Sequence, residues 1–168
     1  MQIIVETSVL YSLMNNRDKN HKLVKNYFLN NKNIYYILPS TIIPELCYLI
    51  NTKLGSYFEI KFLEEINQNF NLEPIKDEDI LRIIEILKKY DTLNIGYVDA
   101  SIVAIAERLK INKILTLDRK HFEVVAPRGF DCFDILIWKF SKVPDDFWLR
   151  YNYSNKEDAL TIWSILFC

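Results

Sequence analysis

The chain has 168 residues, a net charge of −1 and 50% hydrophobic residues, which fits one domain with a full core and excludes a uniformly basic nucleic-acid coat protein. The first apolar run covers only residues 3–5, so we expect no secretory signal peptide, and no stretch approaches the length of a membrane span. Three widely spaced cysteines without a CxxC pair fit a reducing compartment, so a cytoplasmic protein is expected.

Apolar patterns along the chain predict strands that alternate with helices. In chain order, we expect a strand at 3–5, helices within 8–16 and 19–31, a strand at 34–38, helices within 39–50 and over 56–69, a strand within 70–75, a helix over 77–90, a helix within 96–109, a strand at 112–118, and one or two short strands within 122–127 and 130–136. This alternation predicts an α/β sandwich with a mainly parallel central sheet.

Two helices carry more specific expectations. The pattern at 77–90 predicts one apolar face made of Ile80, Ile83, Ile84 and Leu87. His21 is expected on the solvated start of an earlier helix.

The last part of the chain differs from the rest. Residues 1–137 are expected to form the main domain, whereas 138–168 contain all three tryptophans. We expect 138–168 to be an aromatic-rich extension that packs on the domain or lies at an interface, with a stacking platform for single-stranded bases as the alternative.

Four carboxylates occupy corresponding places in this pattern. Glu6 and Asp118 follow predicted strands, and Glu45 and Asp99 lie near the beginnings of predicted helices. Each has an ordinary explanation: an edge acid for Glu6, a first-turn acid for Glu45, an N-cap for Asp99, and a turn or a pair with Arg119 for Asp118. In an open parallel sheet, however, strand ends and following helix starts line one crevice, so we expect the four to converge. Clustered carboxylates need a cation or raised pKa values, and their oxygens suit Mg²⁺ or Mn²⁺.

The stretches "IIVETS", "PELCYLI", "GYVDASIVAIAERL" and "ILTLDRKHF", in this order, resemble a PIN domain, most closely the VapC-type toxins of bacterial toxin–antitoxin pairs. The resemblance runs from residue 2 to about 137 and implies a PIN-like three-layer sandwich with metal-dependent ribonuclease activity. The family's acids fall on Glu6, Glu45, Asp99 and Asp118. Glu6 stands where most members have aspartate, which implies weakened activity.

The resemblance also implies cofactors and partners. Mg²⁺ or Mn²⁺ is expected to be held by Glu6, Asp99 and Asp118, as one ion or two. Residues expected to orient ligands or water are Thr7, Ser8 and Thr116. The expected partners are an RNA substrate, a protein antitoxin and a second copy in a homodimer.

Positive charge is needed around an acidic site that binds RNA. Arg119, Lys120 and Arg128 are the candidates because they lie beside or soon after Asp118, although scattered solubilising charge is an equal alternative for each. His121 follows "DRK" and is expected in a surface turn, with a phosphate contact as the alternative.

Three other functions remain open from the sequence. One is a weakly active or inactive PIN-fold module that binds antitoxin or RNA. A nuclease acting on DNA has the same chemistry. A phospho-receiver domain fits poorly, because "VETS" offers one acid rather than a pair and "TLD" ends in aspartate rather than lysine.

Overall fold

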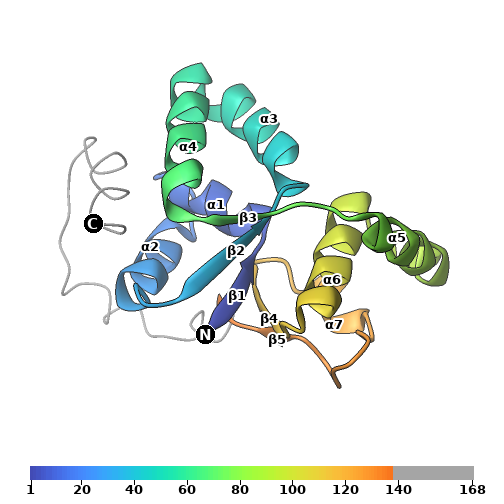
Figure 1. Cartoon of the computed structure of the whole chain (residues 1–168). Coiled ribbons are helices and arrows are strands. Elements are labelled where there is room, and N and C mark those ends of the chain that lie inside the picture. Colours follow the sequence, from blue (N-terminus) through green and yellow to red (C-terminus); the bar gives the residue numbers. More distant parts are fainter. Residues whose placement is uncertain (138–168) are drawn as a thin grey trace.

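The computed structural model describes residues 1–137, and the predicted extension at 138–168 lies outside this range. Five strands form one sheet in the order β3-β2-β1-β4-β5, and every neighbouring pair is parallel (Figure 1). The strands are β1 (Gln2–Val5), β2 (Tyr35–Pro39), β3 (Asn71–Glu73), β4 (Lys113–Leu115) and β5 (Asp134–Ile135). The predicted α/β fold with a parallel central sheet is confirmed.

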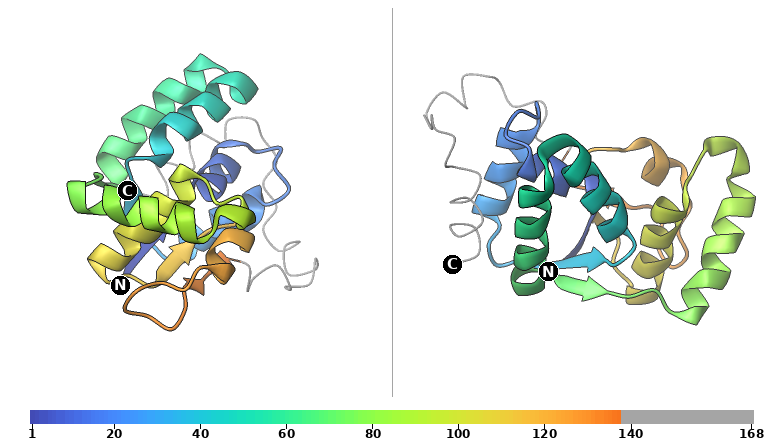
Figure 2. Two further views of the ribbon diagram at one scale, coloured as in Figure 1. Left: turned by 90° about the vertical axis from the view of Figure 1, so that its right-hand side faces the viewer. Right: turned by 90° about the horizontal axis from the view of Figure 1, so that it is seen from above.

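Helices cover both faces of this sheet. They are α1 (Thr7–Met14), α2 (His21–Asn30), α3 (Ile42–Leu54), α4 (Ser56–Asn69), α5 (Asp77–Lys89), the single 3-10 turn η1 (Asp91–Leu93), α6 (Tyr97–Leu109) and α7 (Lys120–Val124). Figure 2 shows α1 to α4 on one side of the strands and α5 to α7 on the other, which gives three layers. This division follows from the strand order, because right-handed crossovers that run from β1 to β3 and those that return from β3 to β5 must use opposite faces.

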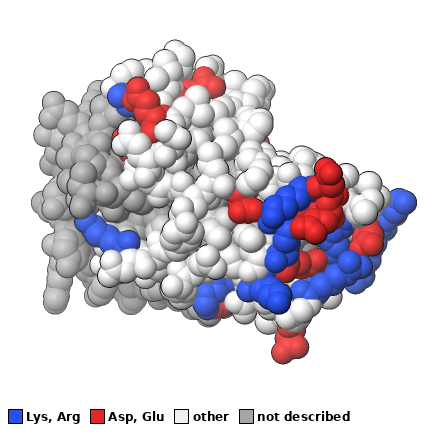
Figure 3. Space-filling view, in the orientation of Figure 1, with Lys and Arg blue, Asp and Glu red and all other residues white. Residues whose placement is uncertain are grey.

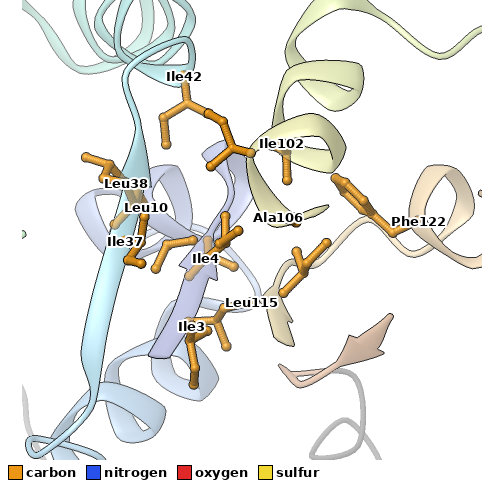
Figure 4. Packing of buried hydrophobic residues seen from close by; sticks show 14 of the residues in the cluster. Ile3, Ile4, Leu10, Ile37, Leu38, Ile42, Ile102, Ala106, Leu115 and Phe122 are labelled. Carbon is orange, nitrogen blue, oxygen red and sulfur yellow. The ribbon is translucent and has the colours of Figure 1, made fainter. Parts of the chain in front are cut away.

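The central strand explains why the core forms here. Ile3, Ile4 and Val5 are fully buried, and each contributes about 1.5–3 kcal/mol relative to an exposed position. Ile4 is paired with Ile37 of β2 and Ile114 of β4, so apolar side chains continue across the sheet (Figure 4). A strand buried on both faces needs a continuous apolar run, and the sequence provides one.

The predicted strand within 122–127 is wrong, because this region contains α7. The Asp118 carboxylate accepts a hydrogen bond from the Lys120 N–H at 3.1 Å and turns the chain before the helix. Phe122 is then buried and packs edge-on against Phe133, with ring centroids 6.4 Å apart. Tertiary packing therefore overrides the strand preference of the consecutive residues Val124 and Val125.

Two smaller expectations are also corrected. His21 is buried rather than solvated, with Nδ1 3.0 Å from the Ser12 carbonyl oxygen, and burial lowers the pKa of its imidazole. On α5, Ile83 and Ile86 are buried, whereas Ile80 and Ile84 are 40% and 43% exposed. The buried face of α5 is therefore narrower than its sequence suggests.

Within residues 1–137, no helix is long and apolar enough to cross a membrane.

Candidate active site

The carboxyl ends of β1 and β4 are adjacent and position two of the acids. Val5 pairs with Leu115 in the sheet, and the Glu6 N–H donates to the Leu115 carbonyl at 3.1 Å. Asp118 follows three residues after the end of β4. Parallel neighbours end at the same edge of a sheet, so Glu6 and Asp118 share that edge.

The first turns of α3 and α6 bring the other two acids. Glu45 lies in the first turn of α3, and Asp99 lies in the first turn of α6. Figure 3 shows the surface hollowed between the α3–α4 pair and the α5–α6 pair, on the side where α3 and α6 begin. Glu6 is buried, Asp99 is half-buried, and Glu45 and Asp118 are exposed, so the four acids differ in how far they are open to solvent.

Electrostatic interactions connect all four acids through Asp99. Burial raises the pKa of Asp99, nearby His121 and the Gly96 N–H lower it, and the charges of Asp118 and Glu45 raise it further. Burial also raises the pKa of Glu6, hydrogen bonds from Ser8 and Thr116 oppose this, and the charge of Asp99 adds to it. The three other acids predicted to converge are therefore each within reach of the charge of Asp99.

Hydroxyl groups hold Glu6 through one of its oxygens. Oε2 accepts hydrogen bonds from the Ser8 hydroxyl and from Thr116 Oγ1, the latter at 2.9 Å. Ser8 Oγ in turn accepts the Leu117 N–H at 3.1 Å, and Thr116 Oγ1 accepts the Asp118 N–H at 2.9 Å. Ser8 and Thr116 therefore link Glu6 to the chain after β4.

The other three acids are each held in the same way. Thr7 Oγ1 donates to Glu45 Oε2 at 2.7 Å. Asp99 Oδ2 lies 2.9 Å from His121 Nδ1 and 3.4 Å from the Gly96 nitrogen. Asp118 Oδ1 accepts from the Lys120 backbone, as described above.

A common pattern follows from these contacts. The side-chain contacts described above fall on one oxygen of each acid, namely Oε2 of Glu6 and Glu45, Oδ2 of Asp99, and Oδ1 of Asp118, and the Ser8 backbone also bonds to the Glu6 carboxylate. Groups that hold one carboxylate oxygen fix the direction of the other, which is how outer residues orient metal ligands.

The donor chemistry fits a hard divalent cation, because carboxylate and hydroxyl oxygens are what Mg²⁺ and Mn²⁺ prefer. Among residues 1–137, no three or more His, Cys, Asp or Glu side chains are placed as a ready ligand group. The acids thus lie near one another, each turned toward its own donor.

The three predicted RNA-binding cations lie in different surroundings. Lys120 is exposed and takes part in no ion pair within the described part of the chain. Arg119 pairs with Glu123 on α7, and Arg128 pairs with Glu85 of α5 at 2.7 Å. Of these three cations, only Lys120 therefore has a charge that no ion pair within residues 1–137 offsets.

A pocket of about 550 Å³ lies away from the acids. Residues of β1, β2 and β3 and the ends of α4 and α6 line it, and none of the four acids does. We place the site at the acids, because their charges and hydrogen bonds indicate chemistry that the pocket does not.

His121 is the site residue that sequence reasoning missed. It was placed in a surface turn because it follows three polar residues. Its contact with Asp99 depends on how α7 packs on α6, and no local pattern reports this packing.

Comparison with known proteins identifies the family to which the fold belongs. The PIN domain profile matches residues 3–126. Ribonuclease VapC26 from Mycobacterium tuberculosis is 29% identical over 135 residues, which cover 80% of this chain and 99% of the relative.

Solved structures share the fold at lower sequence identity. VapC20 from M. tuberculosis, a toxin that cleaves the sarcin–ricin loop, has a TM-score of 0.65 and 20% identity over 71% of this chain and 92% of VapC20. VapBC2 from Rickettsia felis, bound to a promoter DNA fragment, has a TM-score of 0.58 and 15% identity over 74% of this chain and 93% of that chain. With the family profile covering most of its length, this chain belongs to the PIN domain family.

Proposed function

We propose that this chain is a metal-dependent endoribonuclease that hydrolyses RNA phosphodiester bonds, and that it is the toxin of a toxin–antitoxin pair. The observation that carries the proposal is the convergence of four acids, each oriented by hydrogen bonds or an ion pair and each linked electrostatically through Asp99. The similarity to ribonuclease VapC26 supports RNA as the substrate. Residues 1–137 are proposed as the nuclease domain, with 138–168 as an extension.

We assign a different part of the chemistry to each of these residues. Glu6, Asp99 and Asp118 would hold Mg²⁺ or Mn²⁺, which supplies an activated water and stabilises the leaving oxygen when bound. Glu45 is exposed and is proposed to accept a proton from the attacking water, while Thr7 holds its carboxylate. Ser8 and Thr116 keep Glu6 in place.

A bound cation would also remove an electrostatic cost. Two of the acids have pKa values raised by burial and by neighbouring acids, so their charged forms are destabilised without a counter-charge. A divalent cation within the cluster favours those charged forms.

RNA is proposed to approach past Lys120, with Arg119 and Arg128 as further phosphate contacts. A protein antitoxin is the proposed partner by resemblance to VapC-type toxins. A second copy of the chain is the other proposed partner, and the exposed apolar residues of α5 support this.

RNA cleavage by Asp99→Asn tests the proposal. The wild type should cleave RNA with Mg²⁺ or Mn²⁺ and stop in EDTA, whereas Asp99→Asn should lose about 10²-fold or more of the rate while it remains folded. Asp131→Asn, at an exposed acid before β5, is the matched control and should cleave normally. Equal cleavage by Asp99→Asn and the control would refute the site.

The burial of Glu6 favours a second candidate, a weakly active module that binds antitoxin or RNA. Glu6 is only 8% exposed and reaches one methylene farther than the aspartate usual in the family. If the longer side chain weakens the site, Glu6→Asp should raise cleavage across a Mg²⁺ and Mn²⁺ titration. Equal titration curves for Glu6→Asp and the wild type would exclude this explanation of low activity.

A further inference from the structure

His121 reaches the acid cluster because of how α7 is anchored. The next residue, Phe122, is 1% exposed and packs against Phe133. The Asp118 carboxylate receives the Lys120 N–H at the start of the same helix. Because the residues before and after His121 are both fixed, its ring is held against the first turn of α6.

The contact it makes there is partly shielded from water. His121 Nδ1 lies 2.9 Å from Asp99 Oδ2, and the two side chains are 26% and 22% exposed. The Gly96 N–H points to the same oxygen at 3.4 Å. Partial burial makes such a contact stronger than a pair on the open surface.

We propose that His121 is a positioning residue, which holds Asp99 through Oδ2 and thereby directs Oδ1 toward the other acids. The inference rests on the proposed function for the identity of the cation that Oδ1 would bind. It does not depend on the charge of the ring, because an imidazole can donate from Nδ1 in its neutral form as well as its charged form.

The physical reason is rotational freedom. Asp99 is on the first turn of a helix, where the only other hydrogen bond to its side chain within residues 1–137 is the long one from Gly96. Without His121, the carboxylate could turn toward the Gly96 N–H or toward water. Whenever the carboxylate turns away, it no longer faces the cation, and cation binding is weakened. Loss of an outer contact of this kind typically costs about 10–100-fold in affinity.

A purely structural role would be to join α7 to α6, and three variants separate the two roles. His121→Ala removes the donor. His121→Asn keeps an N–H at the position of Nδ1, because both nitrogens are bonded to Cγ. Glu123→Ala is the matched control, since it breaks the Arg119 pair on the same helix without contacting an acid of the site.

Mn²⁺ affinity is measured from free Mn²⁺ by electron paramagnetic resonance, with the melting temperature recorded for each variant. We expect His121→Ala to bind about tenfold more weakly or worse, and His121→Asn and Glu123→Ala to bind close to the wild type. Unchanged affinity in His121→Ala overturns the proposal. Equal weakening in His121→Ala and His121→Asn also overturns it, because the donor would then be irrelevant.

A second measurement applies to the metal-free protein. The backbone amide signals of Gly96 and Asp99 should shift in His121→Ala and keep their wild-type positions in His121→Asn, and unshifted signals in His121→Ala overturn the positioning role. If the wild type binds no Mn²⁺, the proposed cation site fails on its own, and these amide signals still decide the role of His121.

Discussion

Glu6 is the most buried of the four acids, at 8% exposed. Burial raises its pKa above the ordinary value of 4.5, and the charge of Asp99 adds to the rise. The hydrogen bonds from Ser8 and Thr116 offset part of this rise. In the metal-free protein the charged form of Glu6 is therefore less favoured than that of an exposed glutamate.

Replacing Glu6 by Gln should stabilise the metal-free protein at neutral pH. Because the folded-state pKa is raised, the folded protein binds more protons than the unfolded chain, and stability falls as pH rises from about 4.5 through the folded-state pKa. Gln keeps an acceptor for Ser8 and Thr116 but has no charge. We expect Glu6→Gln to melt higher than the wild type at pH 7.5 in EDTA, by about 2–4 °C for each kcal/mol relieved, with the gain vanishing below pH 4.5.

The control for this measurement is Asp131→Asn, whose acid is exposed. It should follow the wild type at every pH. A Glu6→Gln protein that melts below the wild type at pH 7.5 would show that the charged form of Glu6 is stabilised by the fold, in contradiction to the raised pKa.

At this scale the sequence predicts the hydroxyl contacts better than the histidine contact. The family resemblance implied Thr7, Ser8 and Thr116, although Thr7 bonds to Glu45, 38 residues away, and Thr116 bonds to Glu6, 110 residues away. His121 lies 22 residues from Asp99, and its role depends on the docking of α7.

Among the elements, long periodic helices are predicted well and short segments poorly. Helix α4 spans Ser56–Asn69, which coincides with the predicted range 56–69. The short segment at Lys120–Val124 is a helix because Phe122 needs burial, although Val124 and the following Val125 favour a strand. For segments of this length, tertiary contacts outweigh local preference.

Helix α5 has an exposed stripe that fits a second copy of itself. Asp77, Leu81, Ile84 and Lys88 recur at helical spacing, and Leu81 and Ile84 are 68% and 43% exposed. In an antiparallel pair with a twofold axis at the middle of this stripe, Leu81 faces the second copy's Ile84, and Asp77 faces its Lys88. In this arrangement apolar side chains face apolar side chains, and opposite charges face each other.

We therefore expect self-association that depends on these end charges. Asp77→Lys or Lys88→Asp alone should shift the protein toward monomer in sedimentation velocity, because like charges would meet. The double variant Asp77→Lys/Lys88→Asp should restore the dimer, because opposite charges meet again. A wild type that remains monomeric at high concentration, or single variants that dimerise normally, would contradict the antiparallel α5 pairing.

For the whole molecule, the net charge of −1 conceals an uneven distribution. Figure 3 shows basic and acidic side chains intermixed over α5 and α6. Several of these arginines form ion pairs: Arg82 with Glu107, Arg108 with Asp79 and Glu73. Arg82 and Arg108 therefore support the packing of α5 on α6, and their charges are offset by the acids they pair with.

Lys120 should consequently make the clearest contribution to RNA binding. It is exposed next to Asp118, whereas the charge of Arg128 is offset by Glu85 of α5. Each phosphate contact releases condensed counterions, so Lys120→Ala should weaken binding and lower the slope of log affinity against log salt by about 0.7–1 unit. Arg128→Ala should change the slope less, and Lys53→Ala, at the far end of α3 from Glu45, should leave it unchanged. The titrations are made with the cleavage-deficient Asp99→Asn protein so that the RNA stays intact. A larger loss of slope in Arg128→Ala than in Lys120→Ala would place the RNA along α5 rather than beside α7.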